Sequence, residues 1–395
     1  MLENREVCEP QISKKKIFAS LLFVPGVYLM IIVSTLLIVL IGCGLILFIN
    51  YLINKFVGEM GFANLAIYLL AALPFFGILI GLISSVIAIV STLFRTKHFE
   101  PAILINHSDH PKLHNLINEL SKQMNTKMPD SIILHIKSNF FVSNGKIRVF
   151  NGVAKGRILS ISLPLLNVLS INELRAILAH EFAHFTGRDL FYSRIVLPVY
   201  KGAATYLDYI SSVFNYNGRH LGIISVPMIL PNLLMKYYLR IFHKYNMSMS
   251  RDREYRADYI ATLICGNEIV KEALCKIVSH GDVYDRLIDE HMSEKIVHGF
   301  EFENYFNHYR EYIGDYTKYI DESLVEALKA NEDEYHSHPS FLNRILNLPN
   351  VETKYDENEK SLELINHLGY IEVNMTKQYN YYLYQHLAGS SFMYE

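Results

Sequence analysis

Two histidines and a glutamate within five residues are the part of this 395-residue chain best suited to metal chemistry. Residues 180–184 read HEFAH, so His180 and His184 lie four positions apart. On a helix this spacing is about one turn, and it puts both imidazoles on one face, where they can bind one ion. Glu181 lies beside them. Because the chain has 17 histidines, the pattern alone also fits two ordinary helix histidines.

Catalytic zinc needs three protein ligands and one position left open for water. In the extended motif HExxHxxGxxH the third ligand is a histidine, but the corresponding residue here is Leu190, which excludes that class. The segment REYRAD at 253–258 offers Glu254 as the third ligand and Asp258 four residues further on. The Asp258 carboxylate can then accept the free N–H of a ligand histidine and fix its tautomer. Without HEFAH, such an acid pair would indicate only a charged surface helix.

The HEFAH motif lies on a predicted helix that begins at Ser170 and ends near Gly187. Ser170 and Glu173 have the spacing of a capping box, and apolar residues recur at helical intervals after them. Short β-type runs between residues 131 and 163 precede this helix. They predict a small antiparallel sheet, with a turn at residues 143–145.

Two long apolar stretches near the N-terminus predict a membrane anchor. No charged residue occurs from 17 to 54 or from 60 to 94, and each stretch exceeds the roughly 20 residues that a membrane helix needs. We therefore expect a transmembrane helical hairpin at 17–97. Basic residues flank both outer ends, which favours a multi-pass protein of the inner or plasma membrane with both ends in the cytoplasm.

The predicted organisation follows from these elements. A cytoplasmic tail at 1–16 precedes the hairpin, a metal-binding domain that faces the cytoplasm covers 98–350, and a helical extension covers 351–395. The domain contains an apolar insertion at 191–250. Because its two ends must meet at one ion, the insertion crosses the bilayer either twice or not at all. We favour two short or partly embedded helices over a pair that lies on the surface.

Composition limits the classes of function. The chain has 37 Lys and Arg against 39 Asp and Glu, so no basic excess is available to bind nucleic acid. Hydrophobic residues make up 51% and charged residues 19%, which is typical of a protein partly in a lipid bilayer. The four cysteines form no CxxC pair, so a thiolate metal site is not expected. A metal must therefore be bound by histidines and carboxylates.

Three motifs in order, HEFAH, RDREYRAD at 251–258 and SHPSFLNRI at 337–345, resemble the membrane zinc peptidases related to HtpX and the CAAX prenyl protease. The likeness covers about residues 15–350. It implies a mainly α-helical, zincin-like domain of the gluzincin type, with a small sheet and one Zn²⁺ per chain. The family's metal ligands correspond to His180, His184 and Glu254.

The same resemblance assigns the remaining site residues. It implies that Glu181 is the general base, that Asp258 supports the site and that His338, in the His-Pro motif, is an oxyanion donor. Family members carry Asn-Ala-Phe beside the cleft, where this chain has Asn139-Phe140-Phe141. The bulkier Phe140 therefore changes the predicted shape of the substrate groove.

The predicted function is zinc-dependent endopeptidase activity on unfolded or flexible polypeptides, above all damaged membrane proteins. Zinc would lower the pKa of its bound water, and Glu181 would take the proton as that water attacks the peptide carbonyl. Two alternatives stay open at this point. The same chemistry could mature prenyl-proteins or peptides, or the metal could be structural in a membrane scaffold or sensor that has no catalytic activity.

Overall fold

The computed structural model describes residues 14–56, 98–186, 199–200, 202–204, 226–292, 295, 298–314, 317–330, 338–352, 355 and 359–385. The chain divides into two compact units. The first unit comprises Met1–Gln11, Thr96–Leu190 and Ser250–Glu395, and the second comprises Ile12–Arg95 and Phe191–Met249. Every predicted site residue belongs to the first unit, whereas the predicted domain boundaries stay predictions.

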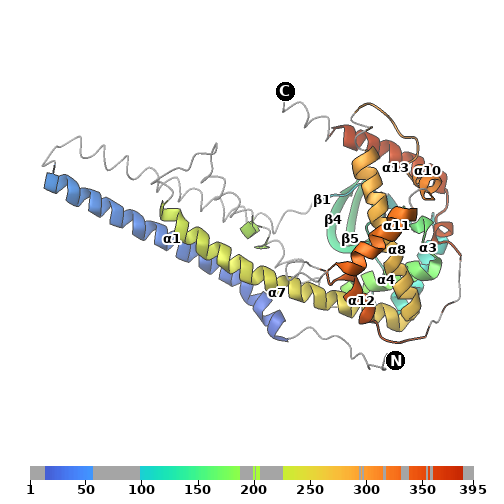
Figure 1. Ribbon diagram of the computed structural model, residues 1–395, viewed down its shortest axis with the longest axis horizontal. Helices are drawn as coiled ribbons and strands as arrows, with labels where there is room; N and C mark the ends of the chain where they lie inside the picture. Colours follow the sequence, from blue (N-terminus) through green and yellow to red (C-terminus); the bar gives the residue numbers. More distant parts are fainter. Residues whose placement is uncertain are drawn as a thin grey trace. The chain divides into compact units, whose positions relative to one another are not determined.

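A five-stranded sheet forms one side of the first unit, in the order β1-β4-β5-β3-β2 (Figure 1). Its strands are β1 (His98–Phe99), β2 (Ala102–Ile105), β3 (Ser131–His135), β4 (Phe141–Val149) and β5 (Gly152–Ser162). Strand β4 pairs with β5 along its whole length, but β1 covers only Ile147 and Arg148 on its other side. Within the described residues, the earlier part of β4 is therefore an open sheet edge.

The sheet is mixed, so the prediction of an antiparallel sheet is wrong. Pairs β2–β3 and β4–β5 are antiparallel, whereas β3–β5 and β1–β4 are parallel. The reason is that the β4–β5 hairpin folds back and inserts β5 between β4 and β3. The predicted turn at 143–145 is also wrong, because β4 runs straight through it and the chain turns between Val149 and Gly152.

The helices of the first unit carry apolar residues at helical spacing and bury them in one core. They are α3 (Pro111–Gln123), α4 (Ile171–Thr186), α8 (Asn267–Arg286), α10 (Tyr305–Tyr312), α11 (Thr317–Lys329), α12 (Phe341–Leu346) and α13 (Leu368–Leu383). Short helical turns cover Leu165–Asn167 and Ser361–Leu364, and a π-helix, Leu287–Met292, follows α8. Helix α4 packs against α3, α8 and β4, so the HEFAH motif is held between the sheet and the helices.

The C-terminal segment packs into this same core. Ile371, Met375 and Tyr379 of α13 are buried in it, and the backbone N–H of Ile171 donates to the carbonyl of Glu359 at 2.9 Å. The segment predicted as a helical extension therefore also braces the start of α4.

The second unit contains α1 (Lys14–Phe56) and the first part of α7 (Val226–Cys265), whose last turns from Ser250 belong to the first unit. The Tyr238 hydroxyl of α7 donates to the Phe23 carbonyl of α1 at 3.0 Å. No helix among the described residues has the length and apolar character needed to cross a membrane. The hairpin at 17–97 stays a prediction, and its second stretch lies outside the described residues, as does most of 191–225.

Candidate metal site and cleft

A capping box fixes the start of α4, as its sequence predicts. The Glu173 backbone N–H donates to the Ser170 hydroxyl at 3.2 Å, and the Ser170 backbone N–H donates to the Glu173 carboxylate at 2.6 Å. Lys276 of α8 pairs with the same carboxylate at 2.7 Å. These contacts satisfy two unpaired N–H groups of the first turn and tie α4 to α8. The HEFAH motif lies three turns further along this anchored helix.

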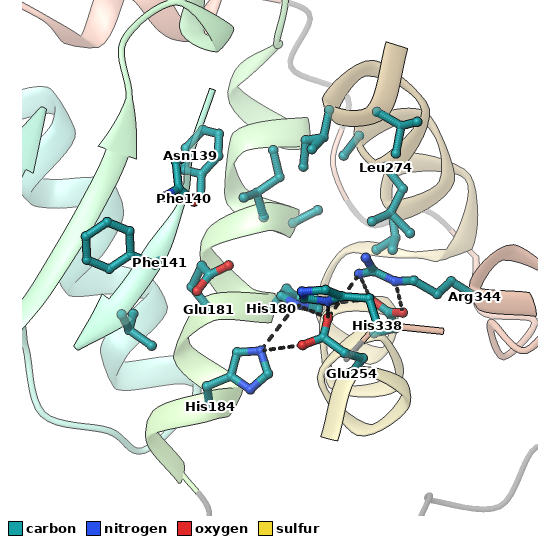
Figure 2. A pocket seen from close by; sticks show the side chains of 18 of the residues that line it. Asn139, Phe140, Phe141, His180, Glu181, His184, Glu254, Leu274, His338 and Arg344 are labelled. Atoms are coloured by element: carbon teal, nitrogen blue, oxygen red, sulfur yellow. Dashed lines mark hydrogen bonds and ion pairs between the residues drawn. The ribbon is translucent and has the colours of Figure 1, made fainter. Parts of the chain in front are cut away.

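Three predicted ligands from two helices converge at one point (Figure 2). The Nε2 atoms of His180 and His184 lie 3.3 Å apart. The two oxygens of Glu254, from α7, lie 3.5 Å from Nε2 of His180 and 3.6 Å from Nε2 of His184. The spacing of HEFAH on α4 supplies one pair of donors, and the packing of α7 supplies the third.

These distances are close to those of a zinc site, with each histidine nearest to a different oxygen of Glu254. Tetrahedral zinc with bonds of about 2.0–2.2 Å holds its ligand atoms about 3.3–3.6 Å apart. Two imidazole nitrogens and one carboxylate oxygen also suit zinc in chemical type. A zinc ion held by these three donors would keep one of its four positions free for water.

A second carboxylate orients the first histidine. Asp258 lies 2.9 Å from Nδ1 of His180, on the side of the ring opposite its Nε2. A carboxylate in this position makes Nδ1 the protonated nitrogen, so Nε2 presents its lone pair to a metal. The contact is the one that the four-residue spacing of Glu254 and Asp258 predicts.

Arg344 is a site residue to which the sequence analysis gave no role. Its Nε and one terminal nitrogen donate to Asp258 at 2.8 and 2.7 Å, and its side chain is 15% exposed. The residue lies in the SHPSFLNRI motif, on the short helix α12. A single arginine among the apolar residues of that helix was the available signal, because a buried guanidinium requires a carboxylate partner.

Burial and neighbouring charges shift the pKa values of His180, Asp258 and Glu254 in opposite directions. Burial disfavours the charged form of His180, but hydrogen bonds with Asp258 and Glu254 outweigh it and raise its pKa to about 10. Burial likewise opposes ionisation of Asp258, yet Arg344 and His180 lower its pKa to about 2. The pKa of Glu254 is also held well below its usual value, against burial, by His180 and His338. Both carboxylates are therefore ionised at neutral pH and available to a cation.

Glu181 and His338 line the same cavity, which has a volume of about 460 Å³. Burial raises the pKa of Glu181, and the neighbouring His180 and His184 oppose the shift. His338 is 67% exposed, and its Nδ1 lies 3.3 Å from Glu254. Its contact is thus with a predicted ligand, and the oxyanion role stays a prediction.

The rest of the cavity wall comes from the sheet and from α8. Figure 2 shows Phe140 and Phe141 on the strand side, Leu274 on the helical side, and His180 and Glu181 between them. Several further apolar residues line the cavity from α4 and α8: Ala176, Ile177, Val270, Ala273, Ile277 and Val278. The cleft is therefore polar at the metal site and apolar beyond it.

An HExxH helix completed by a glutamate from a later helix defines a class of metal-dependent hydrolases. The model of Peptidase family M48 matches residues 107–352, more than half of the chain, including the whole site. The chain belongs to peptidase family M48, as its three motifs indicate.

Several curated relatives are each named Protease HtpX homolog. The protein from Persephonella marina is 31% identical over 170 residues, which cover 41% of this chain and 54% of the relative. The one from Thermodesulfovibrio yellowstonii is 26% identical, over 44% and 60% of the two chains. A relative from Thermoplasma acidophilum is 23% identical, over 78% and 92%. The first two matches thus span little more than half of each relative.

A solved structure, that of S. mikatae Ste24p, is also similar. It covers 82% of this chain and 66% of its own, at 16% identity and a TM-score of 0.32. A TM-score this low supports no argument about the fold.

Proposed function

We propose that this protein is a membrane-bound zinc endopeptidase that hydrolyses unfolded or flexible segments of other proteins, damaged membrane proteins among them. The observation that carries the proposal is the convergence of His180, His184 and Glu254 on one point at ligand spacing. Membership in peptidase family M48 supports the reaction class.

Each residue of the site has a distinct part in this proposal. His180, His184 and Glu254 would hold one zinc ion, and Asp258 would keep His180 in the tautomer that binds it. Zinc, when bound, supplies a Lewis acid that lowers the pKa of water and polarises a peptide carbonyl. Arg344 keeps Asp258 ionised through its two hydrogen bonds.

Glu181 is the proton carrier. Its carboxylate lies in the cavity beside both histidines, where burial raises its pKa toward neutrality. A carboxylate of raised pKa accepts a proton from the attacking water and then donates it to the leaving amine. The water oxygen bonds to the carbonyl carbon and the C–N bond breaks. One fragment leaves with a new carboxyl group, and the other leaves as an amine that has received the proton carried by Glu181.

The open edge of β4 gives an extended substrate its place. The Arg148 carbonyl points outward, since it accepts from the Glu100 backbone N–H at 2.9 Å. The backbone N–H and C=O groups of successive residues point to opposite sides of a strand. Those of Val142 and Asn144 therefore point to the same side as those of Arg148, away from β5. No described residue pairs with that side of β4 before Ile147. A peptide added there bonds through its backbone, which favours unfolded chains over particular sequences.

Membrane attachment rests on the apolar stretches 17–54 and 60–94. With both outer ends in the cytoplasm, the catalytic unit would work at the cytoplasmic face of the inner or plasma membrane. Cytoplasmic loops of damaged membrane proteins are then within its reach.

The test is hydrolysis of casein by the purified full chain in detergent. We expect activity with zinc, loss of activity with a chelator and recovery when zinc is restored. Glu181→Gln should remain folded and zinc-loaded but lose about 10²-fold or more in rate. Glu322→Gln, which changes an exposed glutamate of α11 that pairs with the exposed Lys318, is the control and should keep full activity. An active Glu181→Gln protein would refute the proposed base.

A further inference from the structure

A serine and an aspartate join two walls of the cleft at a point away from the metal ligands. Asp285, in the last turn of α8, accepts the backbone N–H of Ser138 at 3.1 Å and also the Ser138 hydroxyl. Ser138 lies in the segment between β3 and β4, and Asp285 lies 147 positions later in the chain. The pair is therefore a long-range clamp between the sheet and α8.

The other end of the same segment is also anchored. The Lys137 backbone N–H donates to Nδ1 of His135 at 3.0 Å, and Nε2 of His135 lies 3.1 Å from the Glu100 carboxylate. His135 is buried at the end of β3. Two successive backbone N–H groups, those of Lys137 and Ser138, thus bond to side chains from different parts of the unit.

A glycine allows the close approach of this segment to α8. Gly281, one turn before Asp285, faces Ser138. A Cβ at position 281 would lie 3.2 Å from the Ser138 Oγ and 3.3 Å from its Cβ. An alanine at this position would require Ser138 to move by a few tenths of an ångström.

The residues that follow Ser138 are those that line the cleft. Asn139, Phe140 and Phe141 face the cavity from one side, and the apolar residues of α8 face it from the other (Figure 2). Phe141 is also the first residue of β4, whose open edge is the proposed substrate strand. The clamp therefore fixes both the width of the apolar part of the cleft and the start of the edge strand.

We propose that Asp285 is a positioning residue for peptide binding, which holds the Ser138–Phe141 segment at the distance from α8 that an extended substrate requires. This inference rests on the proposed peptidase function and adds a residue to it. Asp285 would not take part in bond cleavage. Its loss should therefore weaken binding of the substrate far more than it slows the chemical step.

The chain offers a matched control on the same helix. Asp282 lies three residues before Asp285 and accepts a serine hydroxyl in the same manner, from Ser323 of α11 at 2.7 Å. It joins α8 to α11 and also pairs with Arg286 of its own helix at 3.0 Å. Asp282→Ala and Asp285→Ala thus each remove a carboxylate that accepts a serine hydroxyl on the same helix, and of the two, Asp285 is the one bonded to the segment before β4.

The experiment measures kcat and KM of the full chain in detergent on an unfolded peptide. We expect Asp285→Ala to raise KM by about fivefold or more while kcat changes by less than about twofold. Asp285→Asn, which keeps an oxygen for the Ser138 N–H, should restore KM, and Asp282→Ala should leave it unchanged. A similar KM for Asp285→Ala and the parent, or an equal rise in both alanine variants, would overturn the inference.

Two further readouts separate positioning from folding and from failure of the proposed function. Amide hydrogen exchange over residues 139–145 should be faster in Asp285→Ala than in Asp282→Ala, even if no peptide is cleaved. Gly281→Ala raises the helix propensity of α8 but displaces Ser138, so it should raise KM without lowering the melting temperature. Unchanged exchange in Asp285→Ala would refute the clamp itself.

Discussion

Replacing Arg344 with leucine should be among the most destabilising single changes in the first unit. The guanidinium makes two hydrogen bonds, at 2.7 and 2.8 Å, to an Asp258 side chain that is 3% exposed. Removal leaves a buried carboxylate with one remaining partner, His180. Breaking a buried ion pair from one side costs about 3–5 kcal/mol, and we expect the free energy of unfolding to fall by that amount.

The double variant Asp258→Asn with Arg344→Leu isolates the cause. It removes both charges, so no buried carboxylate is left unpaired, and most of the lost stability should return. Metal binding should still weaken. The Asp258 carboxylate is a charged acceptor for the His180 N–H, and the asparagine amide that replaces it is a neutral and weaker one. Loss of such a supporting group lowers metal affinity about 10–100-fold.

The assay is equilibrium unfolding of the metal-free full chain in detergent. Circular dichroism is the suitable probe because the chain has no tryptophan. If Arg344→Leu costs less than about 1 kcal/mol, or if the double variant is no more stable than the single one, the ion pair is not the buried interaction described above.

Two other predictions concern the fold around the site. Gly156 has φ +78°, and a Cβ there would lie 2.3 Å from the Asp130 carboxylate, so Gly156→Ala should lower the free energy of unfolding by at least about 2 kcal/mol. Gly369→Ala, in open space, is its control. The His110 pKa is lowered, mainly by burial, and its Nδ1 accepts the Asn366 N–H at 3.1 Å. The His110 imidazole therefore binds a proton more readily in the unfolded chain than in the folded one, and the free energy of unfolding should fall as the pH drops below about 6.5. His110→Asn should make the free energy of unfolding depend less on pH, as measured by unfolding curves from pH 5 to about 8.

Each of these predictions has a clear contrary outcome. Equal stability of the two glycine variants would mean that the left-handed conformation at Gly156 causes no strain. A stability that rises as the solution becomes more acidic, or the same pH dependence in His110→Asn, would show that the buried imidazole is not what links protonation to unfolding.

The sequence predicts the parts of the site that depend on local spacing. The capping box at Ser170 and the four-residue interval in HEFAH act within one or two helical turns, so the pattern alone specifies them. Glu254 followed from the need for a third ligand, and the structure brings it to the two histidines.

The parts that depend on long-range packing were not predictable in this way. Strand β5 lies between β4 and β3 because the hairpin folds back, and no period in the sequence encodes that order. The residues 143–145 have turn-type chemistry, yet the register with β5 keeps them in a strand. Arg344 bonds to Asp258, which lies 86 positions earlier in the chain. The sequence indicates this pair only through the presence of an arginine among apolar residues.

Zinc binding by the Glu254→Gln protein tests the central claim most directly. The measurement is the zinc content of the purified full chain after dialysis against a weak chelator, with Glu268→Gln, an exposed glutamate of α8, as the control. The account predicts one zinc ion per chain in the parent and in the control, and almost none in Glu254→Gln. Retention of a full zinc ion by Glu254→Gln would contradict it, because the two histidines would then hold the metal without the acid from α7.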